Sequence, residues 1–199
     1  MALHPDQSWN RITSWLRQHA PAALATVNAP ATEAEIADVR AMMGMPVPDD
    51  LIAWWRLANG VSAFPGLAPV PLYTPLPIEE VLRTREMMLS VLGPEPSPRV
   101  TELRGEPAGT PYGIGLWLPE WLPIASDHCG YHLFVDLRHG PSHGCVMEYD
   151  KYEGVHDGPL WPGTASMPEQ AADAIVNGGE LRRSRPQATD EGMLEWVVG

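Results

Sequence analysis

Residues 121–149 read WLPIASDHCGYHLFVDLRHGPSHGCVMEY, and this stretch decides the fold of the chain. Three apolar runs alternate in it with short segments rich in Gly, Pro, Ser, Asp and His, which are typical of turns. In the middle run, alternate residues share one face of an extended chain, and these are Tyr131, Leu133, Val135 and Leu137. The pattern predicts a meander of antiparallel strands at 121–125, 131–137 and 145–149.

Helical signals lie on both sides of this meander. Thr32 and Glu35 form a capping box, in which each side chain satisfies a backbone N–H that the first helical turn leaves without a partner. The spacing of apolar residues and the positions of Gly and Pro predict helices at 8–19, 32–44, 51–58 and 78–92, and a short late one at 171–176. Asp49 is expected to cap the third helix, and a short strand is expected at 70–73.

The order of elements, with helices first, a meander next and a helix last, predicts the fold class. We expect a single domain over residues 1–199 with an α+β fold, in which a mixed, largely antiparallel sheet is flanked by helices that pack on one of its faces. Residues 93–113 hold five prolines and four glycines, so we expect a long irregular connection there. The tail after Gly179 regains apolar residues and is expected to dock on the domain.

Charge restricts the partners that the surface can attract. The chain has 25 acidic and 13 basic residues, which gives a formal net charge of −12. A surface of this sign repels phosphate backbones, so we expect no binding of nucleic acid by the bulk surface. The same charge attracts a basic protein partner. Solubility alone is the alternative explanation, because many acidic proteins bind nothing basic.

The sequence shows no targeting signal. Residues Met1–Asp6 lack the basic region and the apolar run of a secretion signal, and no stretch reaches the roughly 18 apolar residues of a membrane span. Cys129 and Cys145 are the only cysteines, which is too few for a disulfide framework. We therefore expect a cytoplasmic protein that does not associate with membranes.

The densest group of reactive side chains falls inside the meander, at Asp127, His128, Cys129, His132, His139, His143 and Cys145. Cys and His are the preferred ligands of zinc. However, no pair with ligand spacing lies on one rigid element, because His139 and His143 fall in a turn rich in Gly and Pro. Surface histidines are the favoured interpretation and no cofactor is expected, with a metal site as the alternative.

Nucleophilic catalysis has no better support. Neighbouring residues of an extended strand point to opposite faces, so His128 and Cys129 would not meet as base and nucleophile. The sequence has no Gly-x-Ser-x-Gly elbow, no phosphate-binding glycine loop and no His-Glu-x-x-His. Glu79 and Glu80 stand where a helix begins, and the helix dipole accounts for them. No catalytic residue is predicted.

Three segments form a recognisable pattern in combination: PDDLIAWWRLANG at 48–60, WLPIASD at 121–127 followed by Gly130, and LFVDL at 133–137 leading into GCVMEYD at 144–150. Together they resemble the SUKH superfamily, named in part for the fungal cell-wall regulators Smi and Knr, over about residues 30–178. The resemblance implies a mixed sheet flanked by helices and a role without catalysis. Bacterial members are commonly immunity proteins that neutralise a toxin effector domain, often a nuclease, and fungal relatives are regulators and scaffolds.

The chain departs from the family pattern in the turn after the second segment. Members usually carry small residues after the aspartate that matches Asp127, where this chain has His128 and a cysteine. They often carry a polar residue where this chain has Tyr131. The 93–113 insertion and the C-terminal tail have no clear counterpart in the family, and such variable segments commonly carry partner specificity.

We therefore expect a module that binds a protein partner, in the first place a basic toxin domain that the chain neutralises. A regulatory or scaffold protein without a toxin partner is the second hypothesis. A metal-dependent enzyme that uses the His and Cys residues of 127–145 is the third. The candidate partner-binding residues are Asp127, His128, Tyr131, Glu148 and Asp150. Asp136 either belongs to that surface or is structural, bonding the backbone of a turn.

Overall fold

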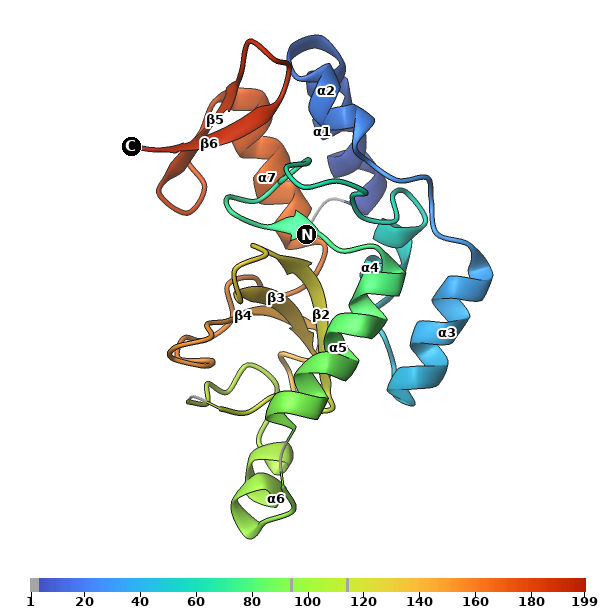
Figure 1. The fold of residues 1–199 in the computed structure, drawn as a ribbon, viewed down its shortest axis with the longest axis vertical. Coiled ribbons are helices and arrows are strands. Elements are labelled where there is room, and N and C mark those ends of the chain that lie inside the picture. The colour runs from blue at the N-terminus through green and yellow to red at the C-terminus, as the bar shows by residue number, and fades with distance from the viewer. Residues whose placement is uncertain (1–3, 94, 114) are drawn as a thin grey trace.

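The computed structural model describes residues 4–93, 95–113 and 115–199 (Figure 1). Its helices are α1 (Pro5–His19), α2 (Pro21–Ala25), α3 (Glu33–Met43), α4 (Asp49–Trp55), α5 (Ile78–Leu92), α6 (Pro98–Gly105) and α7 (Ser166–Asn177). Its strands are β1 (Thr74–Pro75), β2 (Trp121–Ser126), β3 (His132–Asp136), β4 (Cys145–Tyr149), β5 (Ser184–Ala188) and β6 (Leu194–Val198). Within the described ranges, none of the helices combines the length and the apolar character that a membrane span requires.

The three strands of the predicted meander are β2, β3 and β4, and they form one sheet with β1 in the order β1-β2-β3-β4. β3 pairs with β4 along its whole length, from His132 to Asp136. Its pairing with β2 contains a register shift between Pro123 and Ala125, where proline offers no N–H to the ladder. Together with the surrounding helices, the sheet confirms the predicted α+β fold. Each pairing of these four strands is antiparallel.

Two helices follow their sequence signals closely. In α3, the Thr32 hydroxyl accepts from the Glu35 N–H (3.2 Å) and the Glu35 carboxylate accepts from the Thr32 N–H (2.7 Å), so the capping box is present. The helix ends at Gly44, whose φ of 62° closes it in the left-handed conformation. α5 covers the predicted 78–92. α1 begins earlier than predicted, at Pro5, because proline fits the first turn of a helix.

Two local predictions are wrong. α4 has Pro48 at its N-cap, and Asp49, the expected cap, is instead its first helical residue. The segment expected as a strand at 70–73 is a tight turn closed by a single bridge between its first and last residues. Leu72 has a φ of 75° in this turn, which an extended strand does not allow. The strand β1 follows the turn.

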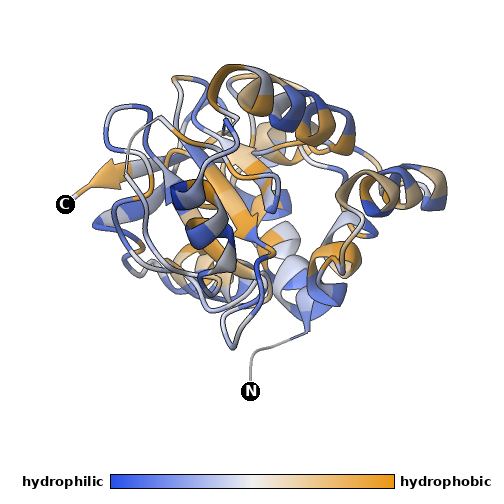
Figure 2. Cartoon of the chain, turned by 90° about the horizontal axis from the view of Figure 1, so that it is seen from below, coloured by the Kyte–Doolittle hydropathy of each residue, from blue (hydrophilic) through white to orange (hydrophobic). Residues whose placement is uncertain are grey.

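The sheet is buried on both faces, and each face has its own apolar cluster. Leu133 and Val135 belong to the larger cluster, which also contains side chains of α1, α3, α4 and α7. Phe134 belongs to the second cluster with Trp117 and Trp121. Figure 2 shows the apolar strands inside and the helices with mixed apolar and polar residues. The prediction that helices pack on one face alone is wrong, because Met88 of α5 and Leu103 of α6 belong to the cluster on the second face.

Residues 93–113 contain a helix, so the prediction of an irregular connection is wrong. Proline fits the first turn of α6, and the hydroxyl of Ser97 accepts from the N–H of Val100 (3.2 Å) to cap it. The helix lies at one end of the long axis of the molecule, whereas α1, α2 and the β5–β6 hairpin lie at the other (Figure 1).

A buried ion pair fastens this segment to the sheet. Asp136 and Arg138 are fully buried and their side chains are 2.7 Å apart. Arg138 donates to the backbone carbonyls of Leu103 (3.1 Å) and Thr110 (2.9 Å). Asp136 accepts from the backbone N–H of Gly109 (2.9 Å) and from that of Arg138 (3.0 Å). Of the two roles considered for Asp136, the structure shows the structural one.

The C-terminal tail docks as predicted, although its strands were not expected. β5 and β6 form an antiparallel hairpin that is separate from the main sheet. Leu194 is buried in the larger apolar cluster, and the indole N–H of Trp196 donates to the carbonyl of Ala68 (2.7 Å). The tail therefore supports the turn that precedes β1.

Candidate functional site

One end of the sheet collects most of the residues that the sequence singles out. In the turn between β2 and β3, the Asp127 carboxylate accepts from the backbone N–H groups of Cys129 (2.7 Å) and Tyr131 (2.8 Å). His128 and Gly130 both have positive φ values, 60° and 107°. Because Asp127 satisfies two backbone donors, it holds this left-handed turn in shape and places the side chain of His128 in solvent.

The turn that follows β4 lies against the first one. Asp150 accepts from the backbone N–H groups of Tyr152 (2.6 Å) and Glu153 (3.3 Å), and its carboxylate also bonds the hydroxyl of Tyr131. Partial burial and then the negative charge of Asp150 raise the pKa of Tyr131. The ammonium group of Lys151 donates to the carbonyl of Cys129 (2.7 Å). These contacts join the two turns into one surface.

Glu148 is engaged inside the protein rather than offered to solvent. Its carboxylate accepts from the Tyr73 hydroxyl and from the Arg182 guanidinium, at 2.7 and 2.9 Å for the latter. The guanidinium also lies over the Tyr73 ring. Burial first, and then the bond to Glu148 and its charge, raise the pKa of Tyr73. The negative charge of Glu148 is therefore balanced by the guanidinium of Arg182.

Three exposed apolar side chains surround these turns, and sequence reasoning missed them. Phe64 is 65% exposed, Leu72 is 75% exposed and Tyr152 is 65% exposed. The Phe64 ring lies 4.5 Å from the His128 ring, measured between centroids. All three occupy turns or loops, where no hydrophobic periodicity marks a residue. We call the sheet-end surface the set Phe64, Leu72, Asp127, His128, Tyr131, Asp150 and Tyr152.

The His and Cys residues of 127–145 do not converge on one point. Cys129 is exposed, whereas Cys145 is buried, and burial raises its pKa to about 12. His143 lies at the opposite end of β3 from His128, with its ring near the Arg138 carbonyl. In the part of the chain that the structure describes, the one group with converging metal-ligand atoms is Asp150, Glu153 and His156. The metal-enzyme hypothesis therefore lacks a geometric basis in the His/Cys cluster.

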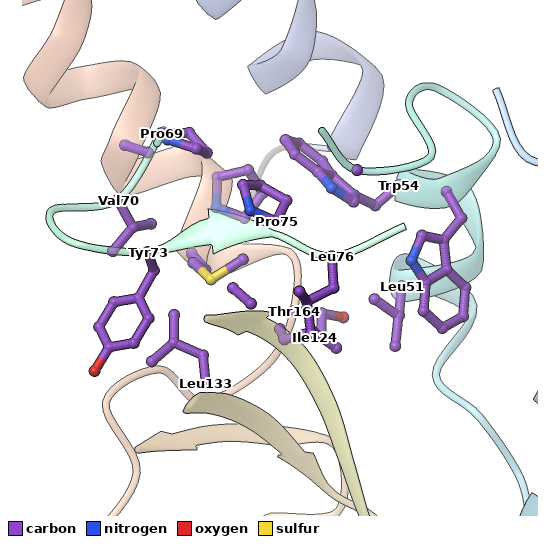
Figure 3. A pocket seen from close by; sticks show the side chains of 16 residues that line it. Leu51, Trp54, Pro69, Val70, Tyr73, Pro75, Leu76, Ile124, Leu133 and Thr164 are labelled. Atoms are coloured by element: carbon purple, nitrogen blue, oxygen red, sulfur yellow. The ribbon is translucent and has the colours of Figure 1, made fainter. Parts of the chain in front are cut away.

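An internal cavity lies beneath β1, between α4, α7 and the sheet (Figure 3). Trp54, Ile124 and Leu133 are among its mostly apolar walls, and the hydroxyl of Tyr73 points away from it. Its volume is about 30 Å³. Pockets that hold small molecules measure roughly 300–1,000 Å³. This cavity is therefore a packing gap of the core rather than a ligand site.

Comparison with known families decides what the chain is related to. The model of the SMI1 / KNR4 family (SUKH-1) matches residues 30–165, which is more than half of the chain. This chain belongs to the SMI1 / KNR4 family. A comparison with curated protein sequences found no match.

The family match confirms the resemblance stated from the sequence. The matched span runs from just before α3 to just before α7, so it contains the main sheet and every residue of the sheet-end surface. The helix α1 and the β5–β6 hairpin lie outside it. The sheet-end surface is thus built on the part that the chain shares with the SMI1 / KNR4 family.

Proposed function

We propose that this SMI1 / KNR4 family protein binds another protein through its sheet-end surface and acts as an immunity-type module. In this role it neutralises a toxin effector domain, such as a nuclease, in the cytoplasm. The observation that carries the proposal is the group of exposed apolar side chains, Phe64, Leu72 and Tyr152, gathered around two interlocked turns. Exposed apolar side chains grouped beside polar ones are typical of interaction sites.

The surface has the composition of an interface core. Aromatic side chains dominate the energetics of protein interfaces because they bury much area with few rotatable bonds. Here the aromatic rings of Phe64 and His128 already contact each other in the free protein, and Tyr131 is held by Asp150. A surface that is ordered before binding loses less conformational entropy on association.

Charge favours a basic partner. The net charge of −12 produces a long-range field that speeds the approach of a basic domain. Glu153 and Asp157 stand beside the sheet-end surface, with 64% and 77% of their side chains exposed. Unlike Glu148, they have no arginine or lysine partner within the described residues, and each lies within 4 Å of the His156 ring. They supply acidic rim charges that a basic partner meets first.

The experiment that tests this proposal pairs the protein with the toxin encoded beside its gene. We expect the purified protein to bind the toxin domain and to inhibit its activity. Tyr152→Ala on the sheet-end surface should weaken binding by about 10-fold or more, as expected for a central aromatic side chain. The matched control is Val198→Ala, because Val198 is 76% exposed on β6 and does not belong to the sheet-end surface.

The rim charges are tested by Glu153→Lys, which should slow association and leave the dissociation rate nearly unchanged. Two results contradict the proposal. One is an equal loss of affinity in Tyr152→Ala and Val198→Ala. The other is a gene neighbourhood without a toxin together with a stable complex between the protein and a cellular regulator, which would favour the regulatory or scaffold role.

A further inference from the structure

The segment that follows β4 carries three side chains whose metal-ligating atoms converge. One carboxylate oxygen of Asp150, one of Glu153 and one ring nitrogen of His156 all lie within 4.8 Å of one another. Oε2 of Glu153 is 3.6 Å from Nδ1 of His156. Two atoms that bind one zinc ion at about 2.1 Å in tetrahedral geometry are separated by roughly 3.4 Å. The side chains therefore need only a small adjustment to share a metal ion.

The backbone holds these three side chains close to one another. Asp150 and Gly154 exchange two backbone hydrogen bonds, of 2.8 and 2.7 Å, which close the turn between them. The next residue, Val155, forms an antiparallel bridge with Tyr112. The segment is thus tied to the rest of the fold between Glu153 and His156. A site that is arranged before binding loses less conformational entropy when its ligand arrives.

A third carboxylate lies on the other side of the imidazole. Oδ2 of Asp157 is 3.3 Å from Nε2 of His156. A carboxylate beside one ring nitrogen favours the neutral tautomer that carries its proton on that nitrogen. Nδ1 then has a free lone pair that faces the Glu153 carboxylate, which is also an acceptor. Two acceptors facing each other are stabilised by a cation between them, and a carboxylate behind the ring is the usual companion of a histidine that binds metal.

We propose that Asp150, Glu153 and His156 bind one divalent transition-metal ion of the zinc class, with Asp157 as the residue that orients the histidine. An imidazole nitrogen together with carboxylate oxygens suits Zn²⁺, whereas Mg²⁺ and Ca²⁺ prefer sites made of oxygen atoms alone. Three protein ligands leave a fourth position of the ion for water. The site adjoins the sheet-end surface, because Asp150 belongs to both. The inference goes beyond the proposed function and does not rest on it.

The site is tested on the full chain without a histidine tag, by isothermal titration calorimetry with zinc chloride near pH 7. We expect saturable binding of one Zn²⁺ per chain, which Ca²⁺ and Mg²⁺ at about 10-fold higher concentration do not prevent. Glu153→Gln and His156→Ala each remove one ligand and should weaken the binding more than about 10-fold. Both side chains are exposed, so these substitutions should leave the fold intact.

The matched control is His4→Ala, which should leave the zinc affinity unchanged. His4 is also exposed beside a carboxylate, with its Nδ1 2.7 Å from Asp6, but no third ligand joins this pair within the described residues. Asp157→Asn removes no ligand and should weaken zinc binding about 10-fold. Nitrogen NMR spectra of the histidine rings provide a separate readout of its positioning role. They should show the metal on Nδ1 of His156 and the proton on Nε2.

The absence of saturable zinc binding would overturn the proposal, and so would an unchanged affinity in Glu153→Gln. Equal losses in His4→Ala and His156→Ala would show adventitious binding by surface histidines only. A metal on Nε2 of His156 would contradict the role of Asp157 and the arrangement proposed. These measurements need no toxin and no other protein, so the metal site and the proposed function succeed or fail separately.

Discussion

The two ends of the main sheet are built from similar turns and differ in what covers them. Asp127 follows β2 and Asp136 ends β3, and each carboxylate accepts hydrogen bonds from the backbone of its own turn. At the Asp136 end, α6 and the segment after it lie over the turn, and Arg138 enters the interior with no exposed surface. At the Asp127 end the side chains of His128 and Cys129 are exposed, and Phe64 and Tyr152 stand mostly in solvent.

Each end places side chains where they are uncommon: the closed end has charged side chains in the interior, and the open end has apolar side chains at the surface. The closed end buries an ion pair, which is costly unless every charge has its partners. The open end exposes aromatic side chains, and Phe64 and Tyr152 are each 65% exposed in the free protein. A buried ion pair defines one arrangement of the segments that it joins. Exposed aromatic side chains on fixed turns gain their contacts only when a partner arrives.

The largest expected effect comes from breaking the closed end. Arg138→Met leaves the Asp136 carboxylate buried without its counter-charge and frees two backbone carbonyls. We expect a loss of about 3–5 kcal/mol in the free energy of unfolding, measured by urea denaturation. Arg182→Met is the control, because the Arg182–Glu148 pair is partly exposed, and it should lose only about 1 kcal/mol. Equal losses in both variants would refute the contrast between the two ends.

A smaller effect is expected from the open end. Asp127→Ala removes the acceptor of two backbone N–H groups in an exposed turn, where water can replace it in part. We expect a loss of about 1–2 kcal/mol in urea denaturation, because hydrogen bonds to a charged group contribute this much. Asp127→Asn keeps one acceptor oxygen and should recover most of the loss. If Asp127→Asn is as unstable as Asp127→Ala, charge rather than hydrogen bonding holds the turn.

The sequence predicted the elements whose signals are local. The capping box at Thr32 predicted the start of α3, and the alternation in 131–137 predicted β3. The helix α6 escaped prediction because five prolines and four glycines dominate the composition of 93–113, while the contacts that fasten it come from Asp136 and Arg138, far along the chain. The composition describes the whole segment as an average and therefore indicates a loop. A single proline in the first turn of a helix is nevertheless compatible with that helix.

The candidate site was predicted only in part, because some of its residues depend on contacts between segments that are far apart in the sequence. Asp127, His128 and Tyr131 lie in a turn that the family resemblance had already marked. Glu148 was included for its charge, but its role depends on Tyr73 and Arg182, which only the fold brings to it. Phe64 and Leu72 could not be found because exposure of an apolar residue in a proline-rich segment depends on the path of the backbone.

At the open end, His132 should make the free energy of unfolding depend on pH below neutrality. Replacing it should change the pH dependence of stability without a large change in stability at neutral pH. Burial lowers the pKa of His132, which the Asp127 charge partly offsets and the nearby His128 reinforces. The unfolded chain therefore binds this proton more readily, so the contribution of neutral His132 is complete above about pH 6.5 and is lost as the pH falls below it. The free energy of unfolding, measured by urea denaturation between pH 5 and 8, should depend less steeply on pH in His132→Phe than in the wild type.

The smallest effect on stability is expected from the exposed aromatic side chains themselves. Phe64 contacts His128 at the surface and adds little to the core, so Phe64→Ala should change the free energy of unfolding by no more than about 0.5 kcal/mol. The same substitution should weaken partner binding at least 10-fold if Phe64 is central to the interface. A loss of affinity together with unchanged stability separates recognition from folding at this end of the sheet. A loss of stability above about 1 kcal/mol would instead make Phe64 a support of the turn, and the two ends would then differ only in degree.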